Sequence, residues 1–180
     1  MINVPVKIVN ILVRKTENID YNPKNQYYFW IIVYKISIFT VSLEKCFVVF
    51  RLGGLNRNLR NELKKSKKIY FYDTGVRNAV IQQFAPVALR GDMGALWENF
   101  FIVERMKRNH YGQHFCNTYF WRTNQQQEID LVEETDGQMT AFEMKWNPSK
   151  KAHFPKAFLE AYPVKETVVV TPENYLEYLV

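Results

Sequence analysis

An Asp136-Gly137 pair set between two alternating segments is the feature that most restricts the fold of this chain. Asp-Gly is a strong signal for a two-residue β-turn, because a type I′ turn needs positive φ angles at both central positions. The flanking segments 127–135 and 138–146 alternate apolar and polar residues with a period of two, as half-buried strands do. The sequence therefore predicts a β-hairpin here.

The length of this turn also determines which side chains face each other. With two turn residues, Asp130 stands opposite Glu143 and Glu128 stands opposite Lys145, and both pairs lie on one face. A three-residue loop would shift the pairing and leave Asp130 diagonal to Glu143. The other face is expected to belong to the core, and it carries Ile129, Leu131, Phe142 and Met144.

Two carboxylates facing each other in a hairpin suggest a cation site. Their Cβ atoms would lie about 5 Å apart, and such like charges destabilise a sheet by up to about 1 kcal/mol. A divalent cation between them would reverse this penalty, and Mg²⁺ commonly takes one or two carboxylates. Lys145 follows Glu143 on the same side, where it could neutralise charge on a scissile phosphate. The simpler interpretation is a solvated face with a Glu128–Lys145 ion pair, which contributes little.

The rest of the chain predicts a mixed sheet with helices against it. Segment 92–110 is the strongest helix, because its apolar residues recur at helical spacing. Asp73 or Thr74 could cap a helix at 76–83. The order of strands and helices is typical of an α/β protein. The other expected elements are strands at 46–52, 68–72, 115–122 and 166–171 and helices at 154–162 and 172–180, the last with Pro172 in its first turn.

Composition divides the chain unevenly. Residues 1–42 show no clean helical or strand period, so we take 43–180 as the folded domain and 1–42 as an atypical N-terminal segment. Residues 1–78 hold 14 Lys and Arg against 5 Asp and Glu, whereas 79–180 hold 10 against 13. The basic half could bind phosphates of an anionic polymer, and the acidic half could bind a divalent cation. The alternative is an ordinary solvated surface.

Several classes of protein are disfavoured. Cys46 and Cys116 form no CxxC pair, which argues against a disulfide framework or a zinc site and favours a reducing cytoplasm. His110 and His114 have no cysteine at metal-ligand spacing. The most apolar stretch, 27–41, is too short and too interrupted to cross a membrane. We therefore expect a cytoplasmic protein without a membrane partner, whose oligomeric state stays open.

Five stretches carry a resemblance to a known family: LEKCFVVFRLGG, KKIYFYDTGVRNAVI, GALWENFFIVERMKR, YFWRTNQQQEIDLVEE and FEMKWNP. From about Leu43 onward, the chain resembles the domain of unknown function found at the C-terminal end of many prokaryotic AAA-type ATPases. That domain is similar to the PD-(D/E)xK superfamily, which implies a restriction-endonuclease-like mixed β-sheet core flanked by helices. No GxxxxGK[ST] motif occurs, so we expect no P-loop ATPase activity from this chain.

The resemblance also implies a set of site residues. The superfamily pattern is a helix glutamate, a strand aspartate and an ExK motif on the next strand. Glu98 matches the helix acid, Asp130 the aspartate, and Glu143 and Lys145 the ExK motif. By this resemblance, the three carboxylates bind Mg²⁺, for which Mn²⁺ could substitute, and Lys145 helps water attack a DNA phosphodiester. Gln127 is a weaker candidate at the edge of the site.

Two other interpretations stay open. The chain could be a non-catalytic module whose basic segment 51–68 contacts nucleic acid or a partner ATPase, with Trp121 and Arg122 as surface contacts. It could also be a truncated remnant of the ATPase protein, with 1–42 read from an altered frame. That idea rests on the abrupt change in composition, and on the poor match of 1–42 to the winged-helix region that the family carries there.

Overall fold

The computed structural model describes residues 37–57 and 66–180. Most of the N-terminal segment 1–42 and part of the basic segment 51–68 lie outside the described residues, so the expectations about them stay untested. Six strands form one mixed sheet in the order β2-β1-β3-β4-β5-β6. The strands are β1 (Val49–Gly54), β2 (Lys67–Phe71), β3 (Asn117–Arg122), β4 (Glu128–Thr135), β5 (Gln138–Met144) and β6 (Val164–Val170). The predicted mixed α/β fold is confirmed.

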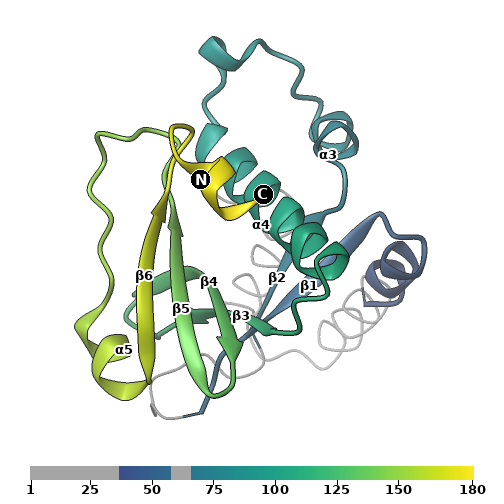
Figure 1. Ribbon diagram of the computed structural model, residues 1–180. Helices are drawn as coiled ribbons and strands as arrows, with labels where there is room; N and C mark the ends of the chain where they lie inside the picture. Colours follow the sequence, from purple (N-terminus) through teal and green to yellow (C-terminus); the bar gives the residue numbers. More distant parts are fainter. Residues whose placement is uncertain (1–36, 58–65) are drawn as a thin grey trace, which may run out of the picture.

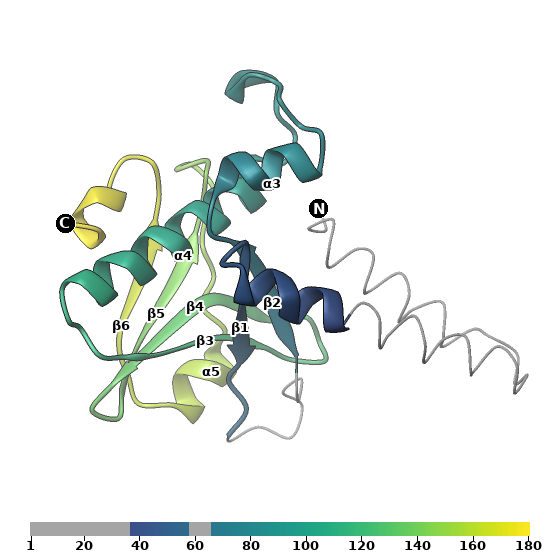
Figure 2. The same cartoon turned by 90° about the vertical axis from the view of Figure 1, so that its right-hand side faces the viewer.

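Helices cover both faces of this sheet (Figures 1 and 2). Residues 37–45 are also helical. The other elements are α3 (Thr74–Val80), α4 (Met93–Tyr111), α5 (Lys156–Ala161) and the short 3₁₀ helices η1 (Val87–Leu89) and η2 (Tyr175–Tyr178). Strand β1 runs parallel to β3, β5 runs parallel to β6, and the other neighbouring strands are antiparallel.

Two apolar clusters hold these layers together. The cluster on the α4 face includes Trp97, Phe101 and Leu131. The cluster on the α5 face includes Trp121, Ile129 and Phe158. Burial of such side chains stabilises a fold by about 1.5–3 kcal/mol each. Packing on both faces therefore holds the sheet in place. The side chains at the ends of its strands project from a rigid backbone.

The hairpin between β4 and β5 has the predicted turn. Asp136 and Gly137 have φ angles of 52° and 76°, as a type I′ turn requires. The register runs from Thr135 opposite Gln138 to Leu131 opposite Phe142, which is the register that a two-residue turn predicts. The expected pairing is thus confirmed for this part of the hairpin.

A bulge in β4 changes which residues share a face. The register between β3 and β4 shifts between Tyr119 and Trp121, so that β4 has one extra residue there. In consequence, Ile129 packs in the α5-side cluster and Leu131 in the α4-side cluster. The prediction of one core face shared by these two residues was wrong, because a bulge interrupts the strict alternation of a strand.

Asp73 and Asp92 precede α3 and α4, but only the first caps its helix with its side chain. The Asp73 carboxylate accepts a hydrogen bond from Val76 N at 2.8 Å. The Asp92 carboxylate instead accepts hydrogen bonds from Arg77 and Arg90, each at 2.9 Å. Asp92 therefore ties the segment between the two helices to the start of α4.

The expected C-terminal helix at 172–180 was wrong, because only η2 forms there. The Asn174 side chain accepts from Thr171 N at 2.8 Å and donates to Val169 O at 2.9 Å. Such side-chain bonds to the backbone compete with a regular helix. The tyrosines of η2 still pack against the α4-side cluster, so this segment closes the core.

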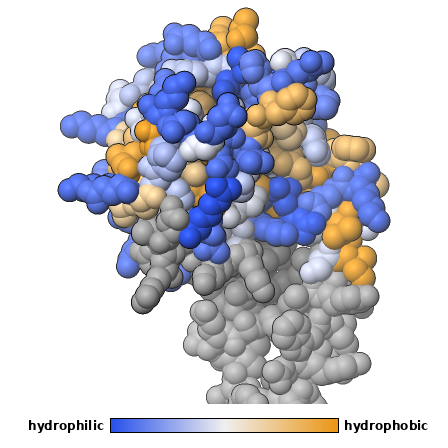
Figure 3. Space-filling view, turned by 60° about the horizontal axis from the view of Figure 1, so that its bottom comes forward, coloured by the Kyte–Doolittle hydropathy of each residue, from blue (hydrophilic) through white to orange (hydrophobic). Residues whose placement is uncertain are grey.

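The surface is mixed. Figure 3 shows hydrophilic side chains interrupted by apolar patches on one face. The segment carrying α3 and η1 projects away from the sheet, and Phe84 and Leu89 in it are exposed (Figure 2). In the described ranges, no helix combines the length and apolar character needed to cross a membrane.

Candidate functional site

The four residues proposed from the sequence line one cavity. Glu98 lies on α4, Asp130 on β4, and Glu143 and Lys145 at the end of β5. All four border an open, polar cavity of about 520 Å³. Side chains separated by up to 47 positions in the sequence are thus brought to one place by the sheet and its crossing helix.

The end of the β4–β5 hairpin places the two strand carboxylates. The Asp130 carboxylate accepts a hydrogen bond from Met144 N at 3.0 Å, just beyond the last backbone pair, Leu131 with Phe142. Glu143 is 6% exposed. Its carboxylate pairs with Lys145 Nζ at 2.6 Å. The ExK pair therefore forms an ion pair beside Asp130.

The helix carboxylate is held by two residues of β2. Lys68 Nζ lies 2.8 Å from Glu98 Oε1, and the Tyr70 hydroxyl donates to the same oxygen at 2.6 Å. Lys68 and Tyr70 are two positions apart on the strand, so both side chains point toward α4. These contacts keep Glu98 directed toward the sheet.

Lys68 also reaches the carboxylates of β4. Its Nζ lies 2.5 Å from Glu128 Oε1 and 3.6 Å from Asp130 Oδ1. Glu128 has a second ion pair with Arg122 at 3.3 Å. The expected Glu128–Lys145 ion pair was wrong, because Lys145 pairs with Glu143 instead. The ladder between β4 and β5 ends before it reaches Glu128.

Because the charged groups are buried close together, the pKa values of Asp130 and Glu143 are raised and that of Glu98 is lowered. Burial, followed by the charge of Glu98, raises the pKa of Asp130 to about 7. Burial also raises the pKa of Glu143 above its ordinary value. Burial alone would raise the pKa of Glu98, but the charge and hydrogen bond of Lys68, the Tyr70 hydroxyl and the charge of Lys145 together lower this pKa. Burial disfavours the Lys68 cation too, yet the acidic groups around it, Glu98 first, together hold the pKa of Lys68 well above its ordinary value.

A strained turn forms another wall of the cavity. Gln126 has a φ of 62°, which is rare for a residue with a side chain. Thr123 stabilises the turn, because its backbone carbonyl accepts from Gln126 N and its hydroxyl from Gln127 N. Gln127, the weaker candidate, lines the cavity together with Gln126. Lys151 and His153, from the segment between β5 and α5, also line it and add further polar and cationic groups.

The types of side chain at this site suit a hard divalent cation. Glu98, Asp130 and Glu143 offer carboxylate oxygens, which are the ligands that Mg²⁺ prefers. The Lys68 ammonium group already lies among the carboxylates of Glu98, Asp130 and Glu128, where it supplies the positive charge that a metal ion would supply. In the part of the chain that the structure describes, no three His, Cys, Asp or Glu side chains are arranged so that they could hold a metal ion.

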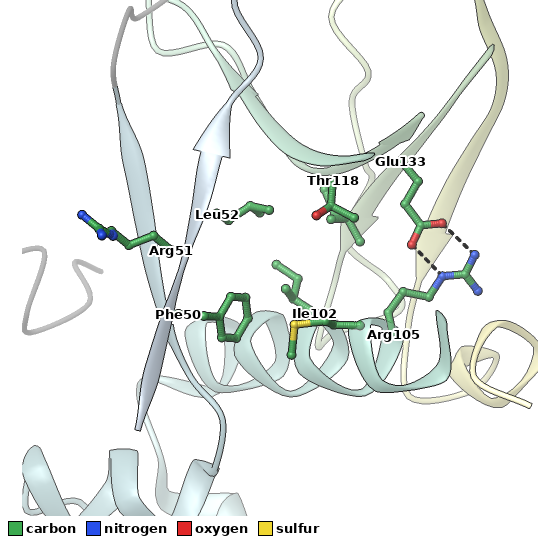
Figure 4. A pocket seen from close by; sticks show the side chains of 9 residues that line it. Phe50, Arg51, Leu52, Ile102, Arg105, Thr118 and Glu133 are labelled. Carbon is green, nitrogen blue, oxygen red and sulfur yellow. Dashed lines mark hydrogen bonds and ion pairs between the residues drawn. The ribbon is translucent and has the colours of Figure 1, made fainter. Parts of the chain in front are cut away.

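A second, smaller cavity of about 190 Å³ lies between β1, β3 and α4 (Figure 4). Apolar side chains, including Leu52 and Ile102, make up most of its wall. The Arg105 guanidinium at its edge donates two hydrogen bonds to the Glu133 carboxylate, at 2.9 and 2.8 Å. This pair anchors α4 to β4, and we regard the cavity as a gap between packed elements.

Sequence reasoning missed some residues of the site. Lys68 and Tyr70 alternate on a predicted strand, but the sequence gives no sign of which helix that strand faces. Lys151 and His153 lie in a segment without a pattern. The suggestion that Trp121 is a surface contact was wrong, because Trp121 is fully buried in the α5-side cluster.

Comparison with known proteins finds two matching domain families and two relatives. Residues 93–179 match a domain of unknown function, DUF4143. Residues 36–86 match a second one, DUF8612. Two relatives, the uncharacterized proteins Rv2008c of Mycobacterium tuberculosis and Mb2031c of Mycobacterium bovis, are each 27% identical over 153 residues. These alignments cover 75% of this chain and 34% of each relative, so the chain spans about a third of their length. No solved structure matches the chain significantly.

Proposed function

We propose that this chain is a nuclease-like domain that binds DNA at the carboxylate cavity and hydrolyses its phosphodiesters with Mg²⁺. The observation that supports this proposal is the convergence of Glu98, Asp130, Glu143 and Lys145 on one open polar cavity. These residues come from α4, β4 and the end of β5, as a PD-(D/E)xK site requires. A chance surface cluster would not need this match in both residue type and element.

Each side chain of the site would have its own role in hydrolysis. In hydrolysis, a water oxygen bonds to phosphorus and releases a proton to solvent, the bond from phosphorus to one ester oxygen breaks, and that ester oxygen takes up a proton from solvent. Glu98, Asp130 and Glu143 would hold the Mg²⁺, which supplies Lewis acidity and makes its bound water more acidic. Lys145, at the cavity wall, offers positive charge to the phosphate oxygens. Lys151, also at the wall, can hold a neighbouring phosphate.

Cleavage of plasmid and single-stranded DNA with Mg²⁺ or Mn²⁺ tests this function. Asp130→Asn and Glu143→Gln should each lower the cleavage rate at least about a hundredfold, as loss of one charge-stabilising group does. Glu166→Gln is the matched control, because Glu166 is an exposed carboxylate on β6. Cleavage that persists in Asp130→Asn and Glu143→Gln would refute the assignment, as would the absence of metal-dependent cleavage by the wild-type protein.

A second candidate is a non-catalytic module that binds nucleic acid or a partner ATPase. The position of Lys68 favours it, because an ammonium group already neutralises the carboxylates without a metal. Fluorescence anisotropy with labelled DNA separates the two functions. DNA binding that is unchanged by Asp130→Asn, without cleavage by any form, would support the binding module.

A further inference from the structure

The Lys68 side chain occupies an unusual position in this site. It extends from β2, at the edge of the sheet, and is only 18% exposed. Its ammonium group lies within 4 Å of Glu98, Glu128 and Asp130, which come from α4 and β4. It also lies 5.4 Å from the centre of the Phe120 ring. One lysine thus joins three carboxylates that would otherwise repel each other.

The same three carboxylates are also exposed to the cavity. Glu98, Glu128 and Asp130 all line it, whereas Lys68 does not. A cation that enters through the cavity therefore meets carboxylates already bound to Lys68. Two positive charges about 4 Å apart repel each other strongly near a protein surface.

We infer that Lys68 is the positioning cation of this site, and that a divalent ion binds Glu98 and Asp130 only by displacing the Lys68 ammonium from them. This inference rests on the proposed function, because it concerns the same carboxylates. Lys68 keeps them assembled while no metal is bound. The ammonium released by the metal becomes available to a DNA phosphate, so that metal and substrate should bind more tightly together than separately.

The test is the affinity of the full chain for Mn²⁺, measured by calorimetry without DNA. Lys68→Met should bind Mn²⁺ at least about tenfold more tightly than the wild-type protein, because the competing charge is gone. Lys67→Met is the matched control, because Lys67 is the exposed neighbour on the same strand and should leave the affinity unchanged. Lys145→Met tests for a general effect of charge, and it should raise the affinity less than Lys68→Met.

A thermal melt reports the positioning role in the same proteins. Lys68→Met should melt at a lower temperature than Lys67→Met in EDTA, and saturating Mn²⁺ should raise its melting temperature more than that of the wild-type protein. If Lys68→Met does not fold, the Mn²⁺ affinity of Lys68→Arg tests the inference instead. This variant keeps a cation that binds carboxylates more firmly, so its Mn²⁺ affinity should be several-fold weaker than wild-type.

Three results would overturn the inference: a folded Lys68→Met with wild-type affinity or weaker, an equal gain in Lys145→Met, or tighter Mn²⁺ binding by Lys68→Arg. The outcome is separate from that of the nuclease assay. Tight Mn²⁺ binding by Lys68→Met, without DNA cleavage by the wild-type protein, would refute only the proposed activity. Cleavage by the wild-type protein, with unchanged Mn²⁺ affinity in Lys68→Met, would refute only the role of Lys68.

Discussion

In the absence of divalent ions, Asp130 should reduce the stability of the fold at neutral and alkaline pH. Its side chain is 16% exposed. Burial, together with the charges of Glu98 and Glu143, raises its pKa from an ordinary 3.8 to about 7. The folded state then holds the proton more tightly than the unfolded state. The resulting stability is fully present below about pH 4 and is lost as the pH rises through about 7.

The size of this effect follows from the pKa shift. About three pKa units, at about 1.4 kcal/mol each, give at most ~4 kcal/mol between the two limits. Between pH 5 and pH 8 the expected loss is about 2–3 kcal/mol. Glu98, whose pKa is lowered, contributes with the opposite sign. The contribution of Glu98 to the pH dependence largely cancels when the wild-type protein is compared with a variant that also contains Glu98.

Asp130→Asn isolates the contribution of Asp130. Asparagine does not ionise near neutral pH, and its carbonyl oxygen can still accept the hydrogen bond from Met144 N. We expect the free energy of unfolding of the variant, relative to wild-type, to rise by about 2–3 kcal/mol between pH 5 and pH 8. Urea unfolding in EDTA at both pH values measures this, with Glu166→Gln as the control. A difference from wild-type that is the same at both pH values would show that Asp130 is not the buried, crowded acid described above.

Two further substitutions test the connections around α4. Asn99→Ala should lower the free energy of unfolding by about 2–4 kcal/mol, because the buried Asn99 side chain satisfies both the N–H and the carbonyl of Phe71; a loss below about 1 kcal/mol in urea unfolding would contradict this. Asp92→Asn should cost about 3–5 kcal/mol near pH 7, because it leaves the buried Arg77 without its carboxylate. Hydrogen bonds, first from Arg90 and then from Arg77, lower the pKa of Asp92 to about 2, so the wild-type protein should lose this advantage as the pH falls from about 4 through 2. An acid titration in which the two proteins lose stability in parallel would count against it.

The hairpin was predictable because its turn depends on local chemistry. Asp136 and Gly137 tolerate positive φ, so the turn length and the register follow from two residues. The bulge near Asp130 could not be read in the same way. One extra residue leaves the local pattern of apolar and polar residues almost unchanged, and its effect depends on the neighbouring strand β3. The faces of Ile129 and Leu131 were therefore assigned wrongly.

The candidate site was predictable only in part, for a similar reason. Glu98, Asp130, Glu143 and Lys145 stand in motifs that mark them, and the structure brings them to one cavity. Lys68 carries no such mark, because its role depends on the pairing of β2 with β1 and on the contact of β2 with α4. The sequence predicts a C-terminal helix with Pro172 in its first turn. The Asn174 side chain instead bonds the backbone of Thr171 and Val169, and only a short 3₁₀ helix follows it.

The contact between Lys68 and Glu98 joins two segments that sequence comparison treats as separate units. Lys68 lies in the region that matches DUF8612, and Glu98 lies in the region that matches DUF4143. The two matched regions therefore belong to one sheet and share the carboxylate cluster. A chain that inherited only the second region would carry the carboxylates without the ammonium group that neutralises them. It would need a replacement cation from a metal or from another protein, and residues on the two sides of the boundary should change together during evolution.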